Sequence, residues 1–352
     1  MITPNPLVGT GLHALGGISA STCYLPYHQT KKWSWVPFWL VQSFFAWILV
    51  PLILGLATVP GFFSVLRDSP TEVVWPAFLL GCLYGFGGMS FGFAIRNIGY
   101  SLTFTISIGL SAILGTLVPL LLKGGLVEYF SRPGGSYILT GMVISVLGVF
   151  VCGWAGFKKE KTLGSASTFN MRKGLILTLI AGVLSAVFNI SLEIGQPIAD
   201  LAAARGAGHF EGNAKLIVST AGCFLVNLVW FVVLGIKENS LQEFTFRTGL
   251  TGKELFRNFF WSGLAGTMWC FQFFFYGLGH VKMGNFQFAS WVIHMSMLIF
   301  FSYMVGVLMK EWKNVSRGTY LTLIIALVLL LCSFLIMTYG SMVGEAAMGT
   351  GH

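Results

Sequence analysis

The sequence predicts an all-α membrane protein with ten transmembrane helices arranged as two inverted five-helix repeats. Three observations carry this prediction. Of the 352 residues, 55% are hydrophobic and only 9% are charged, so the polar side chains are too few to cover a soluble globule of this size. The hydrophobic residues form runs long enough to cross a bilayer. One polar stretch divides these runs into five and five.

Ten apolar runs can cross a hydrocarbon layer of about 30 Å as helices. Their length and lack of charge favour helices over barrel strands, which would alternate in segments of about ten residues. In chain order the runs are 7–27, 36–58, 73–95, 98–122, 136–157, 174–197, 216–236, 258–279, 287–309 and 319–340.

The polar stretch 158–173 divides the chain into two halves. We expect a first five-helix repeat at 1–157, a cytoplasmic linker at 158–173 and a second repeat at 174–352. A repeat with an odd number of helices lies upside down at its second occurrence. Gly-Gly-Ile-Ser-Ala at 16–20 resembles Gly-Val-Leu-Ser-Ala at 182–186, which supports the repeat. Inverted repeats are typical of transporters, whose substrate site lies between the halves.

Lysine and arginine are distributed unequally over the loops. Six lie on one side of the expected membrane, whereas fifteen lie in the loops that join runs 1–2, 3–4, 5–6, 7–8 and 9–10. By the positive-inside rule the richer loops are cytoplasmic, so both termini are expected outside. This placement explains the net charge of +9 as a topology signal, and we expect no nucleic-acid partner.

Three ionisable residues lie inside the runs as drawn: Glu193, His13 and His294. Ionisable groups in hydrocarbon are costly and usually face a cavity, so all three are candidates for carrying a coupled proton. We expect Glu193 to carry the proton, because a protonated carboxyl group is neutral, whereas a protonated imidazole is a cation that needs a hydrogen-bond or charge partner. Helix packing is the alternative for each histidine. For Glu193, near the end of its run, the alternative is a place at the membrane surface.

Amide and indole side chains recur at spacings of three and four residues, which places them on single helix faces. Amides both donate and accept hydrogen bonds, and indoles offer flat apolar faces, so together they suit a neutral polyhydroxylated ligand. Packing between helices is the alternative for each amide. The candidate substrate-binding residues are Asn189, Trp269, Gln272, Gln287, Trp291, His294 and Asn227. One layer, roughly 9–12 Å below the outer boundary by helical rise, is expected to hold His13, Asn189, Gln272 and His294.

Signatures of other functions are missing from the sequence. It has no HExxH, Walker loop or paired acidic metal site, so we expect no enzyme activity, no catalytic residue, no cofactor and no metal. No lysine or arginine lies in the runs as drawn, and a phosphorylated substrate would need such a cation. The substrate is therefore expected to be neutral, and the lipid bilayer is an expected partner. The sequence gives no indication of an oligomeric state.

Four segments resemble a known family. They are "YLPYHQTKKWSW" at 24–35, "WCFQFFFYGLGH" at 269–280, "SWVIHMSM" at 290–297 and "KEW" at 310–312. These segments are similar to the L-rhamnose–proton symporter family of the drug/metabolite transporter superfamily. The resemblance implies ten helices in two inverted repeats, the bacterial inner membrane, and uptake of L-rhamnose or a close analogue with a proton.

The resemblance supports Gln272, Trp291 and His294, which lie in matching segments, but it does not support Glu193. In the family an amide can occupy that place while a carboxylate lies near Gln287, so the acid and the amide are exchanged in this sequence. The expected function is symport of L-rhamnose or a related neutral sugar with a proton, by alternating access. The alternatives are an exporter of a neutral or cationic metabolite from the same superfamily and a membrane sensor or scaffold.

Overall fold

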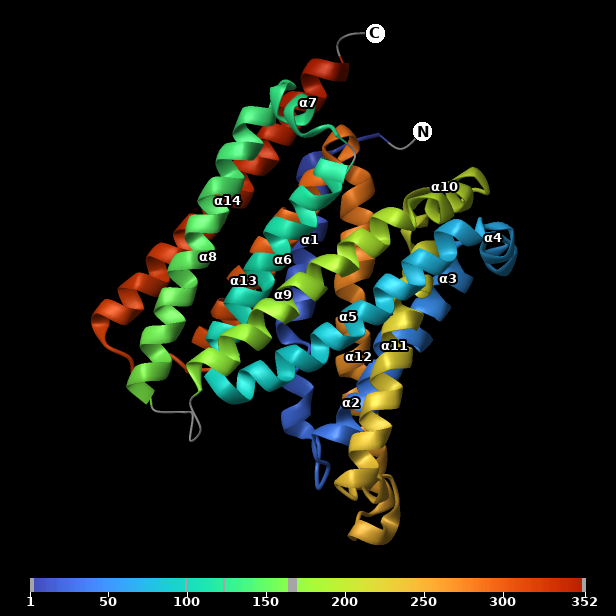
Figure 1. The fold of residues 1–352 in the computed structure, drawn as a ribbon, viewed down its shortest axis with the longest axis vertical. Helices are drawn as coiled ribbons and strands as arrows, with labels where there is room; N and C mark the ends of the chain where they lie inside the picture. The colour runs from blue at the N-terminus through green and yellow to red at the C-terminus, as the bar shows by residue number, and fades with distance from the viewer. Residues whose placement is uncertain (1–2, 99, 123, 164–169, 350–352) are drawn as a thin grey trace. The chain divides into compact units, whose positions relative to one another are not determined.

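The computed structural model describes residues 3–98, 100–122, 124–163 and 170–349, and these residues form helices and loops without any strand (Figure 1). The chain divides into two compact units. Unit 1 comprises Met1–Ser21, Gly87–Ile190 and Phe275–His352, and unit 2 comprises Thr22–Phe86 and Ser191–Phe274. Each unit is described by itself below.

Unit 1 is built mainly from long helices. Local sequence signals mark where two of these helices begin. Helix α14 follows Ser316, whose hydroxyl accepts a hydrogen bond from the Thr319 backbone N–H at 3.2 Å. Helix α8 follows Gly134, which has a positive φ of 83°. The helices of unit 1, whole or in part, are α1 (Pro6–Thr22), α5 (Thr71–Ile98), α6 (Tyr100–Leu122), α7 (Leu126–Ser131), α8 (Gly135–Leu163), α9 (Met171–Ile194), α12 (Gly252–Lys282), η6 (Gly284–Ala289), α13 (Ser290–Leu308) and α14 (Arg317–Gly349).

Unit 2 shares parts of α5, α9 and α12 with unit 1 and adds elements of its own. One of these elements, η2, is a π-helical turn that links α2 to α3 in a continuous helical segment. The elements that belong to unit 2 alone are η1 (Leu25–Gln29), α2 (Trp35–Phe44), η2 (Phe45–Leu49), α3 (Val50–Thr58), α4 (Phe62–Asp68), α10 (Gln196–Ala204), η3 (Gly208–Phe210), α11 (Gly212–Lys237), η4 (Ser240–Phe244) and η5 (Phe246–Thr248).

The prediction of apolar spanning helices is confirmed for eight of the ten runs. Helices long and apolar enough to cross a membrane coincide with every run except 7–27 and 258–279, so the protein is an all-helical, multi-pass membrane protein. The two remaining runs are also helical. The first is α1, which has only 17 residues because it ends at Thr22, and the second lies in α12, which mixes Gly, Ser and Gln with its aromatic residues. The count of ten spans stays a prediction.

The boundaries of the halves differ in detail from the predicted ones. Helix α8 continues through the first residues of the expected linker and ends at Leu163, whereas 164–169 lie outside the described residues. The sixth run is divided, because α9 ends at Ile194 and α10 begins at Gln196, with Pro197 in its first turn.

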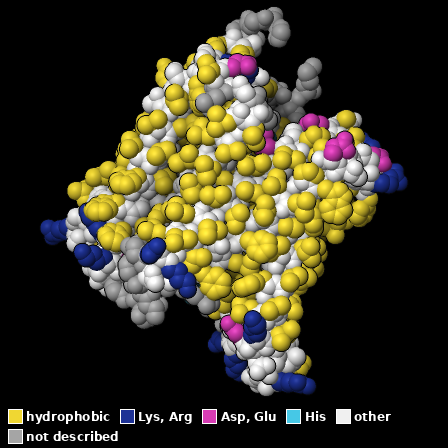
Figure 2. All heavy atoms as spheres, viewed as in Figure 1, with side chains coloured by type: hydrophobic (Ala, Val, Ile, Leu, Met, Phe, Trp, Pro, Cys, Tyr) yellow, Lys and Arg dark blue, Asp and Glu magenta, His cyan; other side chains and the backbone are white. Residues whose placement is uncertain are grey.

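Large hydrophobic side chains lie exposed along the long helices. On α14, Leu321, Ile325 and Val328 are each roughly half exposed and share one helix face. Hydrophobic side chains cover most of the visible helix surfaces, and charged side chains gather near the helix ends (Figure 2). A surface of this kind would be costly in water and is the surface that lipid tails cover.

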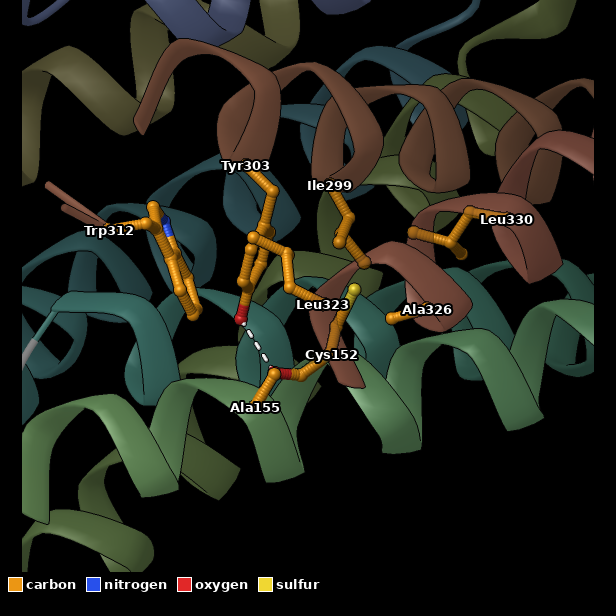
Figure 3. Packing of buried hydrophobic residues seen from close by; sticks show 8 residues of the cluster. All are labelled: Cys152, Ala155, Ile299, Tyr303, Trp312, Leu323, Ala326 and Leu330. Atoms are coloured by element: carbon orange, nitrogen blue, oxygen red, sulfur yellow. Dashed lines mark hydrogen bonds between the residues drawn. The ribbon is translucent and has the colours of Figure 1, made fainter. Parts of the chain in front are cut away.

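Unit 1 has a hydrophobic cluster where α13 and α14 pack on α8 (Figure 3). The ring of Tyr303 points across it, and its hydroxyl donates to the Cys152 carbonyl oxygen at 2.9 Å and lies 2.5 Å from the Thr105 hydroxyl. Further hydroxyl contacts join other helices of the unit: Thr10 of α1 lies 2.7 Å from Thr338 of α14. These contacts fix the positions of α1 and α13, which carry the candidate site.

Candidate functional site

Two of the three candidate proton carriers lie together in unit 1. His13 on α1 and His294 on α13 are fully buried, and their ring centroids are 5.7 Å apart in an edge-on arrangement. All four ring nitrogens are buried and have no hydrogen-bond partner within the described part of the chain. A buried polar atom without a partner costs about 1–3 kcal/mol, so four of them at one place call for a functional explanation.

Glycines allow α1 to approach its neighbours closely enough to bring the two histidines together. A Cβ at Gly17 would lie 3.2 Å from the backbone of Met297 and Leu298 on α13, and a Cβ at Gly279 of α12 would lie 2.7 Å from Cε1 of His13. The Ser21 hydroxyl donates to the Leu298 carbonyl oxygen at 3.0 Å. Helix α1 therefore packs against α12 and α13 at backbone distance, with His13 between them.

Tyr276 on α12 connects the histidines to a hydrogen-bond network. Its ring centroid lies 5.6 Å from that of His13 and 5.4 Å from that of His294. Its hydroxyl donates to Asn189 Oδ1 at 3.0 Å, and Asn189 Nδ2 donates to the Gly115 carbonyl oxygen at 2.8 Å. The amide of Asn189, a predicted substrate ligand, thus holds Tyr276 in place in this structure.

Trp291 completes the wall of this site. Its Nε1–H donates to the Ser111 carbonyl oxygen at 3.0 Å, and its ring stands at 87° to that of Tyr276, with 5.3 Å between centroids. A Cβ at Gly115 would lie 2.4 Å from Nε1 of Trp291, so the indole rests directly on α6. Gln287 lies in η6 and is part-buried.

The other candidates lie in unit 2, where Asn227 is held by protein partners. Its Oδ1 accepts the Trp39 indole N–H at 3.1 Å, and its Nδ2 donates to the carbonyl oxygens of Cys223 at 2.9 Å and Gly85 at 3.4 Å. These contacts join α2, α5 and α11 through Asn227, and its predicted role in substrate binding stays a prediction.

Glu193, Trp269 and Gln272 are also residues of unit 2. Glu193 is part-buried near the end of α9, and Gln272 is buried on α12, one turn after Trp269. The indole nitrogen of Trp269 is buried without an acceptor among the residues the structure describes. Contacts through Tyr276 therefore join the predicted residues His13, His294, Asn189 and Trp291 in unit 1, whereas Glu193, Trp269, Gln272 and Asn227 belong to unit 2. The single layer that was expected to unite His13, Asn189, Gln272 and His294 stays a prediction.

Sequence reasoning missed a buried cation. Lys215 is 7% exposed in α11, which lies in a candidate span from Gly208 to Lys237. Its Nζ donates to Gln196 Oε1 at 2.5 Å. The predicted run began at residue 216, whereas α11 begins at Gly212, because the lysine itself was taken as the loop boundary. The argument that no cation is available in the spans is wrong at this residue.

Known proteins resemble this chain over most of its length. The family model described as L-rhamnose-proton symport protein (RhaT) matches residues 4–344. An L-rhamnose-proton symporter of Mannheimia succiniciproducens is 33% identical over 316 residues, which cover 88% of this chain and 91% of that protein. L-rhamnose-proton symporters of Yersinia pestis and Yersinia pseudotuberculosis are each 32% identical over 311 residues, 87% of this chain and 90% of each relative.

Proposed function

The chain belongs to the L-rhamnose-proton symport protein (RhaT) family, and from this membership we propose that it takes up L-rhamnose, or a closely related neutral sugar, together with a proton. The transport crosses the bacterial inner membrane by alternating access. The observation that carries the proton half of the proposal is the buried pair of His13 and His294, whose ring nitrogens have no partner within the described part of the chain.

We propose that the fold has ten spans in two inverted repeats, with both termini periplasmic. Two findings support this. The runs 7–27 and 258–279 are helical, and the boundaries between the units fall in the first and third runs of each half, after Ser21, Phe86, Ile190 and Phe274. A cysteine at Ser165, which lies outside the described residues, should react only from the cytoplasm, and one at Gly349 only from outside. Reaction of both from one side contradicts this topology.

We propose that the histidine pair binds one proton at a time. Two positive charges about 5.7 Å apart repel each other by about 3 kcal/mol at an effective dielectric constant of about 20. A second proton would therefore bind more than about 100-fold more weakly than the first. The neutral imidazole of the pair can accept a hydrogen bond from the protonated one. It thereby supplies the partner that a buried cation needs. This supports the histidines over Glu193 as the carrier, against the expectation from the sequence.

Three variants separate the candidates in one assay on inverted or right-side-out vesicles with an imposed proton gradient. We expect His13→Asn and His294→Asn to exchange labelled L-rhamnose across the membrane but to lose its proton-driven accumulation. Glu193→Gln should retain both. Exchange activity is the control for a folded protein. The opposite pattern assigns the proton to Glu193, and accumulation that survives in all three variants refutes the proton assignment.

We propose that the amide and indole groups bind the sugar, with Gln272 as the most direct test. Leucine is apolar, so the Gln272→Leu variant should insert into the membrane normally. The purified variant should no longer bind L-rhamnose, as measured by calorimetry. Normal binding by a well-expressed Gln272→Leu variant would return this residue to helix packing.

A further inference from the structure

Aromatic side chains from α2 and α12 meet around Tyr24 in unit 2. The Tyr24 ring centroid lies 6.0 Å from that of Trp35, 6.3 Å from that of Trp39 and 5.5 Å from that of Trp269. The ring stacks on Trp39, with 13° between their planes, whereas Trp269 meets it edge-on. Tyr24, Trp35 and Trp269 are only part-buried. Tyr24, Trp35, Trp39 and Trp269 form what we call the aromatic cluster, and part of its ring surface is accessible.

The helix beside the aromatic cluster departs from regular α-helical geometry. Residues Phe45–Leu49 form the π-helical turn η2, in which the Val50 N–H bonds to the Phe45 carbonyl oxygen. Such turns inside helices are frequent at functional sites. The turn carries Trp47, whose ring centroid is 6.1 Å from that of Trp39. A Cβ at Gly266 would lie 2.3 Å from the Gln42 carbonyl oxygen, so α2 and α12 are in backbone contact next to the turn.

Three neutral polar atoms beside the aromatic cluster are buried without a hydrogen-bond partner among the residues the structure describes. They are the Nε1–H donors of Trp47 and Trp269 and the Oε1 acceptor of Gln42. Gln42 follows Trp35 and Trp39 at spacings that keep all three on one face of α2. The Trp39 indole, in contrast, is satisfied by Asn227 at 3.1 Å. Native proteins leave few buried polar atoms unpaired, so three at one place point to a ligand.

We propose that this region of unit 2 is a sugar-binding site formed by the aromatic cluster together with Gln42 and Trp47. Flat rings stack against the apolar C–H faces of a sugar, and hydroxyl groups can both accept from the two indoles and donate to the amide. A cation would leave the indole donors unpaired, and an anion would leave the amide acceptor unpaired. A neutral polyol satisfies both. The identity of the sugar, L-rhamnose, rests on the proposed function.

The test measures L-rhamnose binding to the purified full-length protein by calorimetry, without a proton gradient. Trp269→Phe keeps a ring and removes one N–H, and Gln42→Leu removes the acceptor. We expect each variant to bind at least about tenfold more weakly, with unchanged or higher thermal stability in the absence of sugar. The matched control is Trp33→Phe, because the Trp33 Nε1–H already donates to the Glu243 carbonyl oxygen at 2.8 Å. Its affinity should stay within about twofold of wild type.

The outcomes separate this inference from the proposed function. If the wild-type protein binds L-rhamnose and both variants bind it equally well, the site is refuted while the proposed function stands. The same conclusion follows if the variants only lose stability, since that identifies packing residues. If the wild-type protein binds no L-rhamnose, the proposed substrate fails and the site proposed for it fails with it.

Discussion

Gly279 on α12 is the position where one added methyl group perturbs the histidine pair most directly. A Cβ there would lie 2.7 Å from Cε1 of His13, 2.9 Å from Nδ1 of the same ring and 2.9 Å from the Gly9 carbonyl oxygen. Carbon atoms in favourable contact are about 3.5–4.0 Å apart. In Gly279→Ala the imidazole must therefore move by about 1 Å, and the backbone of α1 must move with it, because a carbonyl oxygen cannot rotate away.

The expected cost of Gly279→Ala follows from two opposing effects. Overpacking of a close helix contact costs about 1–3 kcal/mol, whereas replacing a helical glycine by alanine otherwise gains about 0.5–1 kcal/mol. We expect a net loss of about 1–2 kcal/mol of stability. Proton-driven accumulation of L-rhamnose should fall by more than about tenfold, since a displacement of this size can cost about 100-fold in positioned chemistry.

The matched control is Gly277→Ala, two residues earlier on the same helix, where an added Cβ meets nothing within 4 Å. Thermal unfolding in detergent and vesicle accumulation should place this variant at or above wild type. If Gly279→Ala and Gly277→Ala behave alike in both assays, the close packing of α12 against His13 is not what holds the site.

Two further predictions concern individual contacts. Tyr276→Phe removes the donor to Asn189 Oδ1 and leaves a buried acceptor unpaired, so thermal unfolding should show a loss of about 1–3 kcal/mol, and an unchanged midpoint would contradict the network. The Arg205 guanidinium, bonded at 2.8 Å, holds the pKa of Asp68 below its usual value. Because the pKa of Asp68 is lower in the folded than in the unfolded protein, its ionised form stabilises the fold at pH values above the unfolded pKa of about 3.9. This contribution is lost as the pH falls through the folded pKa. The midpoint difference between wild type and Asp68→Asn should therefore be largest near neutral pH and shrink below about pH 3.9, and a difference that does not change with pH would refute this contribution.

The sequence was sufficient for the helices but not for their contacts. Runs of apolar residues identify spanning helices because the bilayer demands them, which is why eight runs were confirmed. Helical rise gives the depth of His13 and His294 but not the direction in which each side chain points. Their proximity depends on the glycines that let α1 approach α12 and α13, and no local pattern distinguishes these glycines from others of the 44.

Other features of the two units were also out of reach. The apolar period of residues 35–58 is the same for an α-helix and for one with a π-helical turn, so η2 could not be predicted. Only Pro51, which lacks a backbone N–H, hints at an irregular turn there. The hydrogen bond from Tyr276 to Asn189 joins residues 87 positions apart, and only tertiary packing could bring them together.

If the coupled proton binds the histidine pair as proposed above, the spacing of the two imidazoles also limits how steeply the protein can concentrate its substrate. A site that holds a single proton carries one charge inward with each sugar. One charge moved through a potential of 100 mV is worth about 2.3 kcal/mol, which corresponds to an accumulation of about 50-fold at equilibrium, and each unit of pH difference adds about another factor of ten. A cell that relies on this protein therefore trades a low energy cost per sugar for a modest ceiling, and it gains most where the sugar outside is not scarce.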